Sequence, residues 1–146
     1  MSNSLNEKEV LREIYKNSSL AVESIEAILS KVYDEDLAYD LNKQLHKFKD
    51  IALKSETRLN EMGQKPIHDD LIGKAMLWAS IQMNTLMNIS TSHIADLLIK
   101  GNKRGVGDML KSSKKNKDCG AYATELANEL VDFEVENIER LKGYKK

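Results

Sequence analysis

Apolar residues recur at spacings of three and four along most of this chain, which is typical of helices that bury one face. In residues 6–33 the repeat is formed by Leu11, Ile14, Ser18, Ala21, Ile25, Ile28 and Val32. This stripe predicts a first helix that packs at a shallow angle against a neighbouring helix.

A second stripe follows in the residues after Tyr33. Its members are Leu37, Leu41, Gln44, Leu45, Phe48, Ile51, Ala52, Ser55, Leu59 and Met62. Asp34 or Asp36 can cap the start of this helix with a side-chain oxygen, and Gly63 can end it. The link between the first two helices is then only a few residues long, so we expect them to run antiparallel.

The third segment is marked by the absence of charge between Lys74 and Asp96. A helix without charge on any face is normally enclosed by other elements, so we expect this run to lie inside the protein. Pro66 opens the predicted helix, which extends to about Lys100 and stops at Gly101. The run holds too many Asn, Gln, Ser, Thr and His residues for a membrane span. An apolar arc around Trp78 is the predicted surface for a homo-oligomer.

A fourth helix is predicted from Asp118 or Gly120 onward. Its face consists of Tyr122, Ala123, Leu126, Ala127, Leu130, Phe133, Ile138 and Leu141. The link at residues 101–117 is predicted to be a surface excursion, the most mobile part of the chain, with a short helix around Val106, Met109 and Leu110. Residues 1–146 are thus expected to form one all-α domain, an antiparallel four-helix bundle.

Composition and charge narrow the function without defining it. A single proline leaves little that would turn a sheet, and a net charge of −1 argues against a dedicated nucleic-acid binder. The polar N-terminus does not resemble a signal peptide, and the lone Cys119 agrees with a reducing compartment. We therefore expect a cytoplasmic protein that does not enter membranes.

Five polar residues fall on the predicted inward faces: Gln44, Ser90, His93, Glu134 and Asn137. A buried carboxylate is costly unless it is paired, hydrogen-bonded or protonated, so Glu134 is expected to have a partner such as His93, Gln44 or a backbone group. We interpret these residues as a structural hydrogen-bonded cluster. The alternative is a metal site that uses His93 and Glu134.

The stretches NTLMNISTSHIADLLIKG and FEVENIERLK resemble an uncharacterised family of small bacterial ferritin-like four-helix bundles. The resemblance implies a ferritin-like fold, with iron or manganese as the alternative cofactor to none. Di-iron members of that superfamily carry two Glu-x-x-His pairs. Here His46, His68 and His93 are preceded three positions earlier by Lys43, Lys65 and Ser90, so the ligand pattern is absent and metal redox chemistry is disfavoured.

The link at residues 101–117 is rich in basic side chains, among them Lys103, Arg104, Lys114 and Lys115. Its glycines do not have the spacing of a phosphate-binding loop, so a solvated basic loop is the default interpretation. Binding of an anion or a nucleic acid is the alternative. The sequence assigns no catalytic residue, which favours a non-enzymatic binding or structural protein.

Overall fold

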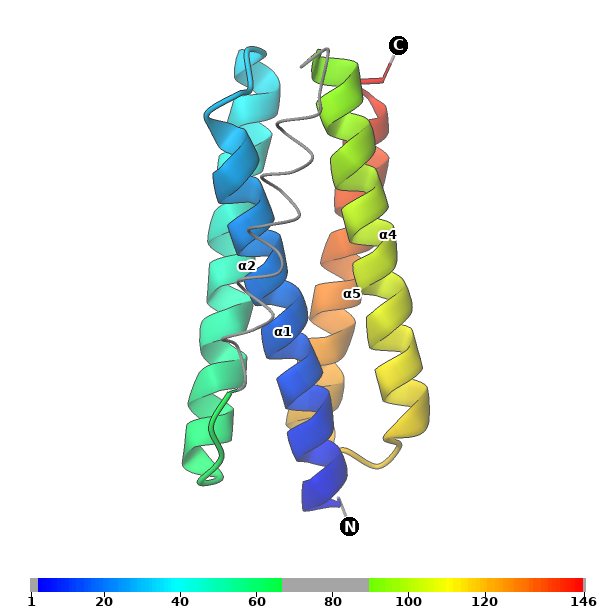
Figure 1. Ribbon diagram of the computed structural model, residues 1–146. Helices are drawn as coiled ribbons and strands as arrows, with labels where there is room; N and C mark the ends of the chain where they lie inside the picture. Colours follow the sequence, from blue (N-terminus) through cyan, green and yellow to red (C-terminus); the bar gives the residue numbers. More distant parts are fainter. Residues whose placement is uncertain (1–2, 67–89, 146) are drawn as a thin grey trace.

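The computed structural model describes residues 3–66 and 90–145, and within them the chain forms four helices and no strand. The helices are α1 (Ser4–Leu29), α2 (Glu35–Glu61), α4 (Thr91–Lys115) and α5 (Ala121–Lys142). They lie side by side as a helical bundle, with the α1–α2 link at the top of the view and the α4–α5 link at the bottom (Figure 1). In this part of the chain no helix combines the length and the apolar character that crossing a membrane requires.

Side-chain caps set where the first two helices begin. Asn3 Oδ1 accepts from the backbone N–H of Leu5 at 2.9 Å, and Asp34 Oδ1 accepts from that of Leu37 at 2.9 Å. The predicted cap at Asp34 is therefore confirmed. The predicted end at Gly63 is also confirmed, because Gly63 follows the last turn of α2 with a positive φ of 72°.

The other predicted boundaries were less accurate. The first helix ends at Leu29 instead of Tyr33, whose side chain is exposed. The start of α5 agrees with the predicted Gly120 turn, but Tyr122 is exposed and not on the buried face.

The prediction that a helix stops at Gly101 is wrong. The helix α4 begins after Ser90, continues through Gly101, Gly105 and Gly107, and ends at Lys115. The predicted link at 101–117 is thus mostly helix. Its buried face is continuous, with Ile94, Ala95, Leu98, Ile99, Asn102, Gly105 and Met109 at helical spacing. Burial of this face outweighs the cost of about 1 kcal/mol that each glycine adds relative to alanine. The predicted start of the third helix and the arc around Trp78 lie outside the described residues.

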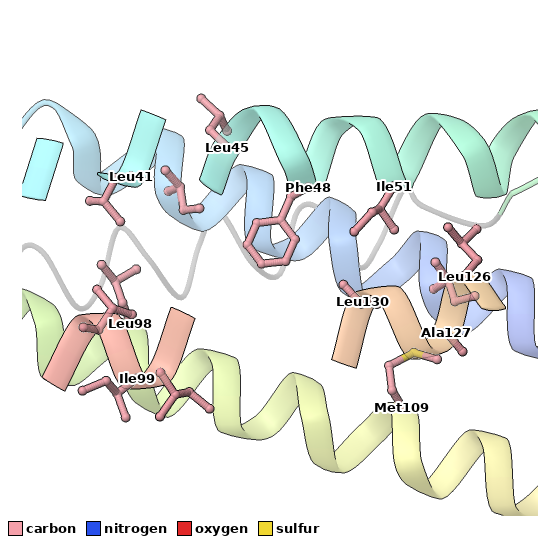
Figure 2. Close-up of a cluster of buried hydrophobic side chains, with 14 of the residues drawn as sticks. Leu41, Leu45, Phe48, Ile51, Leu98, Ile99, Met109, Leu126, Ala127 and Leu130 are labelled. Carbon is pink, nitrogen blue, oxygen red and sulfur yellow. The ribbon is translucent and has the colours of Figure 1, made fainter. Parts of the chain in front are cut away.

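Leucine, isoleucine and alanine side chains from all four helices form one apolar core. In Figure 2, Phe48 and Ile51 point from α2 toward α5, and Met109 points from α4 toward Ala127 and Leu130. Phe48 also meets Phe133 of α5 edge-on, with the ring centroids 4.9 Å apart. The core therefore joins the α1–α2 pair to the α4–α5 pair.

Polar contacts at the edges of the core connect the same helices. Lys47 Nζ of α2 lies 3.2 Å from Glu129 Oε1 of α5, and Arg58 of α2 donates to Glu7 of α1 at 3.0 Å. Because the carboxyl group of Glu7 is buried, its ion pair with Arg58 helps to fix the register of α1 against α2.

Candidate functional site

A cavity of about 260 Å³ lies between α1 and α4, near the middle of the bundle. Its apolar lining comes from Leu20, Ile25 and Ile28 of α1, Phe48 of α2, and Leu98 of α4. Gln44 of α2 and Glu134 of α5 also line it. All four helices therefore contribute to the wall of one cavity.

Gln44 and Glu134 are buried polar residues with side-chain atoms to which no described residue forms a hydrogen bond. Gln44 is 4% exposed and Glu134 is 1% exposed. Within the described residues, neither the amide nitrogen nor the amide oxygen of Gln44 has a hydrogen-bond partner. Glu134 Oε1 has none either. The prediction that Glu134 is paired with His93, Gln44 or the backbone is thus wrong for Oε1. Leaving such groups unpaired costs about 1–3 kcal/mol each, so their position beside a cavity calls for an explanation.

The side chain of Glu134 fits against α4 because residue 105 is a glycine. A Cβ at position 105 would overlap the Glu134 carboxyl group and would lie 2.7 Å from Asn17 Oδ1. Asn17 of α1 donates from Nδ2 to the Gly105 carbonyl at 2.8 Å, which holds α1 and α4 together at this point. Gly105 and Asn17 therefore form a cradle for the carboxyl group of Glu134.

The environment of Glu134 favours its protonated form. Burial raises its pKa from 4.5 to about 8, and the nearby Asp108 carboxylate contributes to the rise. Within the described part of the chain, no cationic side chain contributes an opposite effect on this pKa. At neutral pH the carboxyl group is therefore mainly neutral and able to donate a hydrogen bond.

Asn137, the third predicted core residue, is buried as expected but belongs to a different contact. Its Nδ2 donates to Asn102 Oδ1 at 3.5 Å, and Asn102 in turn donates to the Leu98 carbonyl at 2.8 Å. This contact joins α5 to α4.

Ser90 and His93 do not lie in the core, contrary to the prediction. Ser90 is the N-cap of α4 and accepts from the backbone N–H of His93 at 3.3 Å, while the His93 side chain is exposed. His93 is twelve residues before Gly105, about 18 Å along the helix axis. Because Gly105 adjoins Glu134, His93 and Glu134 are too far apart to share a metal ion. Across residues 3–66 and 90–145, no three His, Cys, Asp or Glu side chains gather in a way that could hold one.

Lys103, Arg104, Lys114 and Lys115 are exposed, as predicted, but they belong to a helix and not to a loop. At 100° per residue they fall on the side of α4 opposite to the buried Met109. Lys100 and Lys111 lie on the same side. We call these six residues the basic face of α4.

Sequence reasoning identified Gln44 and Glu134 but missed Asn17, Gly105 and Asp108. The helical stripe gave a signal for Asn17, which lies three positions after Ile14 and is buried. Nothing in the sequence shows that Gly105 faces Glu134, because that contact depends on how α4 packs against α5.

Comparison with family models, with curated proteins and with solved structures gives no match to this chain. The resemblance to small ferritin-like bundles therefore stays a prediction. Function has to be inferred from the cavity and from the charged surface.

Proposed function

We propose that this protein binds a small molecule in the cavity between α1 and α4, and that it does so without catalysing a reaction. The observation that carries the proposal is the presence of buried, unpartnered polar atoms of Gln44 and Glu134 in the wall of that cavity. A ligand that hydrogen-bonds to these atoms would remove their unfavourable desolvation.

The size and lining of the cavity support a small, mainly apolar ligand. An engineered apolar cavity of about 150 Å³ binds benzene, and sites for drug-sized ligands are about 300–1,000 Å³. The volume of about 260 Å³ lies between them. Apolar walls with a few convergent polar groups are the usual composition of small-molecule sites.

Thermal shift measurements with three probes test this proposal. Hexanol, hexylamine and hexanoate share one apolar body and differ in their polar group. We expect at least one of them to raise the Tm of the wild-type protein, because a ligand that binds only the folded state stabilises it. If none of the three raises Tm at millimolar concentration, the proposal is wrong.

A cavity-filling variant locates the binding. Ala21 lines the cavity, whereas Ala121 is exposed at the start of α5. Ala21→Leu should abolish the Tm shift because its added methyl groups occupy the cavity, and Ala121→Leu should keep it. Equal shifts in the two variants would place the probe elsewhere and would contradict the proposal.

The basic face of α4 supports a second candidate function, the binding of a nucleic acid. Its six residues span positions 100–115, about 22 Å of helix, and all are exposed. The continuity of α4 through Gly101 is what places them on one side of a rigid element. Lys100 is also paired with Asp96 at 3.2 Å, which reduces its contribution.

Binding of labelled duplex DNA at several salt concentrations tests this second function. Replacing Lys103, Arg104, Lys114 and Lys115 by glutamine should weaken DNA binding. The slope of log K against log salt concentration should become shallower by about 0.9 for each phosphate contact that is lost. A matched control neutralises the exposed Lys31, Lys43, Lys49 and Lys65. Equal loss in both variants would mean that only net charge matters.

We further propose that the bundle is antiparallel and ferritin-like and that the protein is cytoplasmic. We also propose a homo-oligomer that forms through the predicted third helix. Light scattering tests the oligomer.

The alternative of an iron or manganese protein using His93 and Glu134 predicts near-stoichiometric metal after purification without chelators. The exposure of His93 and its separation from Glu134 weigh against that alternative.

A further inference from the structure

The uncharged and unpartnered polar groups in the wall of the cavity include more hydrogen-bond acceptors than donors. Among residues 3–66 and 90–145, Gln44 Oε1 and Glu134 Oε1 are buried without partners. Asn17 places its Oδ1 near the Glu134 carboxyl group, while its Nδ2 donates to the Gly105 carbonyl. The Gln44 amide nitrogen is the unpartnered donor in this group. When Glu134 is ionised, these acceptor oxygens therefore outnumber the donor nitrogen beside them.

We infer that the cavity takes a primary amine, with the ammonium group hydrogen-bonded to Glu134 and Gln44 and the apolar body packed against Phe48, Ile28 and Leu98. This inference rests on the proposed small-molecule function and specifies the chemical class of the ligand. An ammonium group has three donors and no acceptor, which complements these oxygens. Its charge would also relieve the repulsion between Glu134 and Asp108.

The charged groups around Glu134 favour a cation over an anion. Asp108 of α4 lines the cavity, and its charge already disfavours the ionised form of Glu134. From α1 the cavity is lined by Glu13 and Lys16, whose charged atoms lie 3.3 Å apart and largely cancel. Arg104 and Asp108 of α4 are both exposed and opposite in charge, and the residues of α2 that line the cavity, Gln44 and Phe48, carry no charge.

A carboxylate ligand is the main rival. Lys16, Lys100 and Arg104 lie around the cavity, and a protonated Glu134 with the Gln44 amide would offer two donors to it. However, Lys100 is paired with Asp96 and Lys16 with Glu13. Arg104 is exposed and so is Asp108, but the Asp108 charge acts on Glu134 and would repel a carboxylate bound there. The observed charges therefore favour the ammonium ligand.

Binding of an amine is coupled to the release of a proton from Glu134, whereas binding of an alcohol is not. Below pH 8 the Glu134 carboxyl group holds a proton, whereas an alkylammonium ion carries its own positive charge throughout this range. Forming the ion pair ionises Glu134 and releases its proton to solvent. Hexylamine affinity should thus rise about tenfold per pH unit below pH 8 and level off above it, while hexanol affinity stays constant.

Isothermal titration calorimetry of the wild-type protein tests these expectations. Hexylamine is titrated at neutral pH in two buffers of different ionisation enthalpy, which reports the number of protons released. We expect close to one proton for hexylamine and none for hexanol. Hexylamine should bind about tenfold more tightly than hexanol at pH 8, the size of one charge-assisted hydrogen bond.

The variant Glu134→Gln preserves the shape of the protonated side chain and removes its ionisation. It should lose the preference for hexylamine over hexanol and release no proton when hexylamine binds. If hexanol or hexanoate binds the wild type as tightly as hexylamine, the amine inference is wrong and the small-molecule function stands. If none of the three probes binds, the proposed function itself fails.

Discussion

At the scale of single residues, Glu134 makes the stability of the fold depend on pH. Its pKa is about 8 in the folded protein and close to its ordinary value of 4.5 in the unfolded chain. Below pH 4.5 both states hold the proton, and between 4.5 and 8 only the folded state does. The stabilisation from Glu134 is therefore complete at low pH and is lost as pH rises toward 8, by up to about 5 kcal/mol.

Urea denaturation of the wild type and Glu134→Gln across this pH range measures the effect. The free energy of unfolding of the wild type should fall relative to the variant as pH rises from 4.5 to 8. Other groups titrate in both proteins, so they cancel in the difference. A difference that does not change with pH would show that Glu134 has an ordinary pKa.

Gly105 is the second residue on which the site depends. Gly105→Ala should destabilise the protein by about 1–3 kcal/mol, because the added methyl group overlaps the Glu134 carboxyl group and crowds Asn17. The helix propensity of alanine, about 1 kcal/mol better than glycine, offsets part of this. The midpoint of urea denaturation should fall, and a rise would mean that Glu134 does not occupy this space.

At the scale of the helices, the sequence predicted α2 and α5 well and α4 poorly. The stripe of α2 is unbroken and is bounded by Asp34 and Gly63, so local signals were sufficient. In α4 the glycines were interpreted as breaks, although burial of the face that includes Leu98 and Met109 keeps the helix continuous. Helix propensity is local, whereas that burial depends on α1 and α5.

The contrast between local sequence signals and contacts between helices also explains which residues of the site could be predicted. Helical periodicity placed Gln44, Glu134 and Asn137 on buried faces, and all three are buried. His93 was misplaced because the periodicity of the uncharged run was extended through it, whereas α4 begins after the Ser90 cap, which leaves His93 exposed in its first turn. The cradle of Asn17 and Gly105 depends on a contact between helices, which one helix's periodicity cannot show.

The glycines of α4 that face open space allow a test of this helix. An added Cβ at Gly101 or Gly107 would meet nothing within 4 Å. Gly101→Ala and Gly107→Ala should each stabilise the protein by about 1 kcal/mol, the opposite sign to Gly105→Ala. Thermal unfolding measures the three variants side by side. If Gly101→Ala does not raise Tm, residue 101 is not inside a helix.

At the scale of the whole molecule, the cavity lies where the α1–α2 pair meets the α4–α5 pair. Gln44 and Phe48 reach it from α2, Glu134 from α5, and Asn17 bridges α1 to α4. A ligand bound there would contact all four described helices. We therefore expect binding to stabilise the bundle as a unit, and loss of packing beside the cavity to weaken every helix.

The variant Phe48→Ala tests whether the described helices unfold as one unit. Phe48 is 1% exposed, packs edge-on against Phe133 and lines the cavity, so its removal should cost about 3–5 kcal/mol. If the core is cooperative, hydrogen–deuterium exchange should become faster in α1 and α4 as well as in α2 and α5, because all open through the same global unfolding. The exposed Leu53 lies in the same helix, and Leu53→Ala should change stability by less than about 0.5 kcal/mol. Faster exchange confined to α2 and α5 would instead mean that the loss of Phe48 acts only on the two helices that meet at Phe48 and Phe133, and that the described helices do not unfold as one unit.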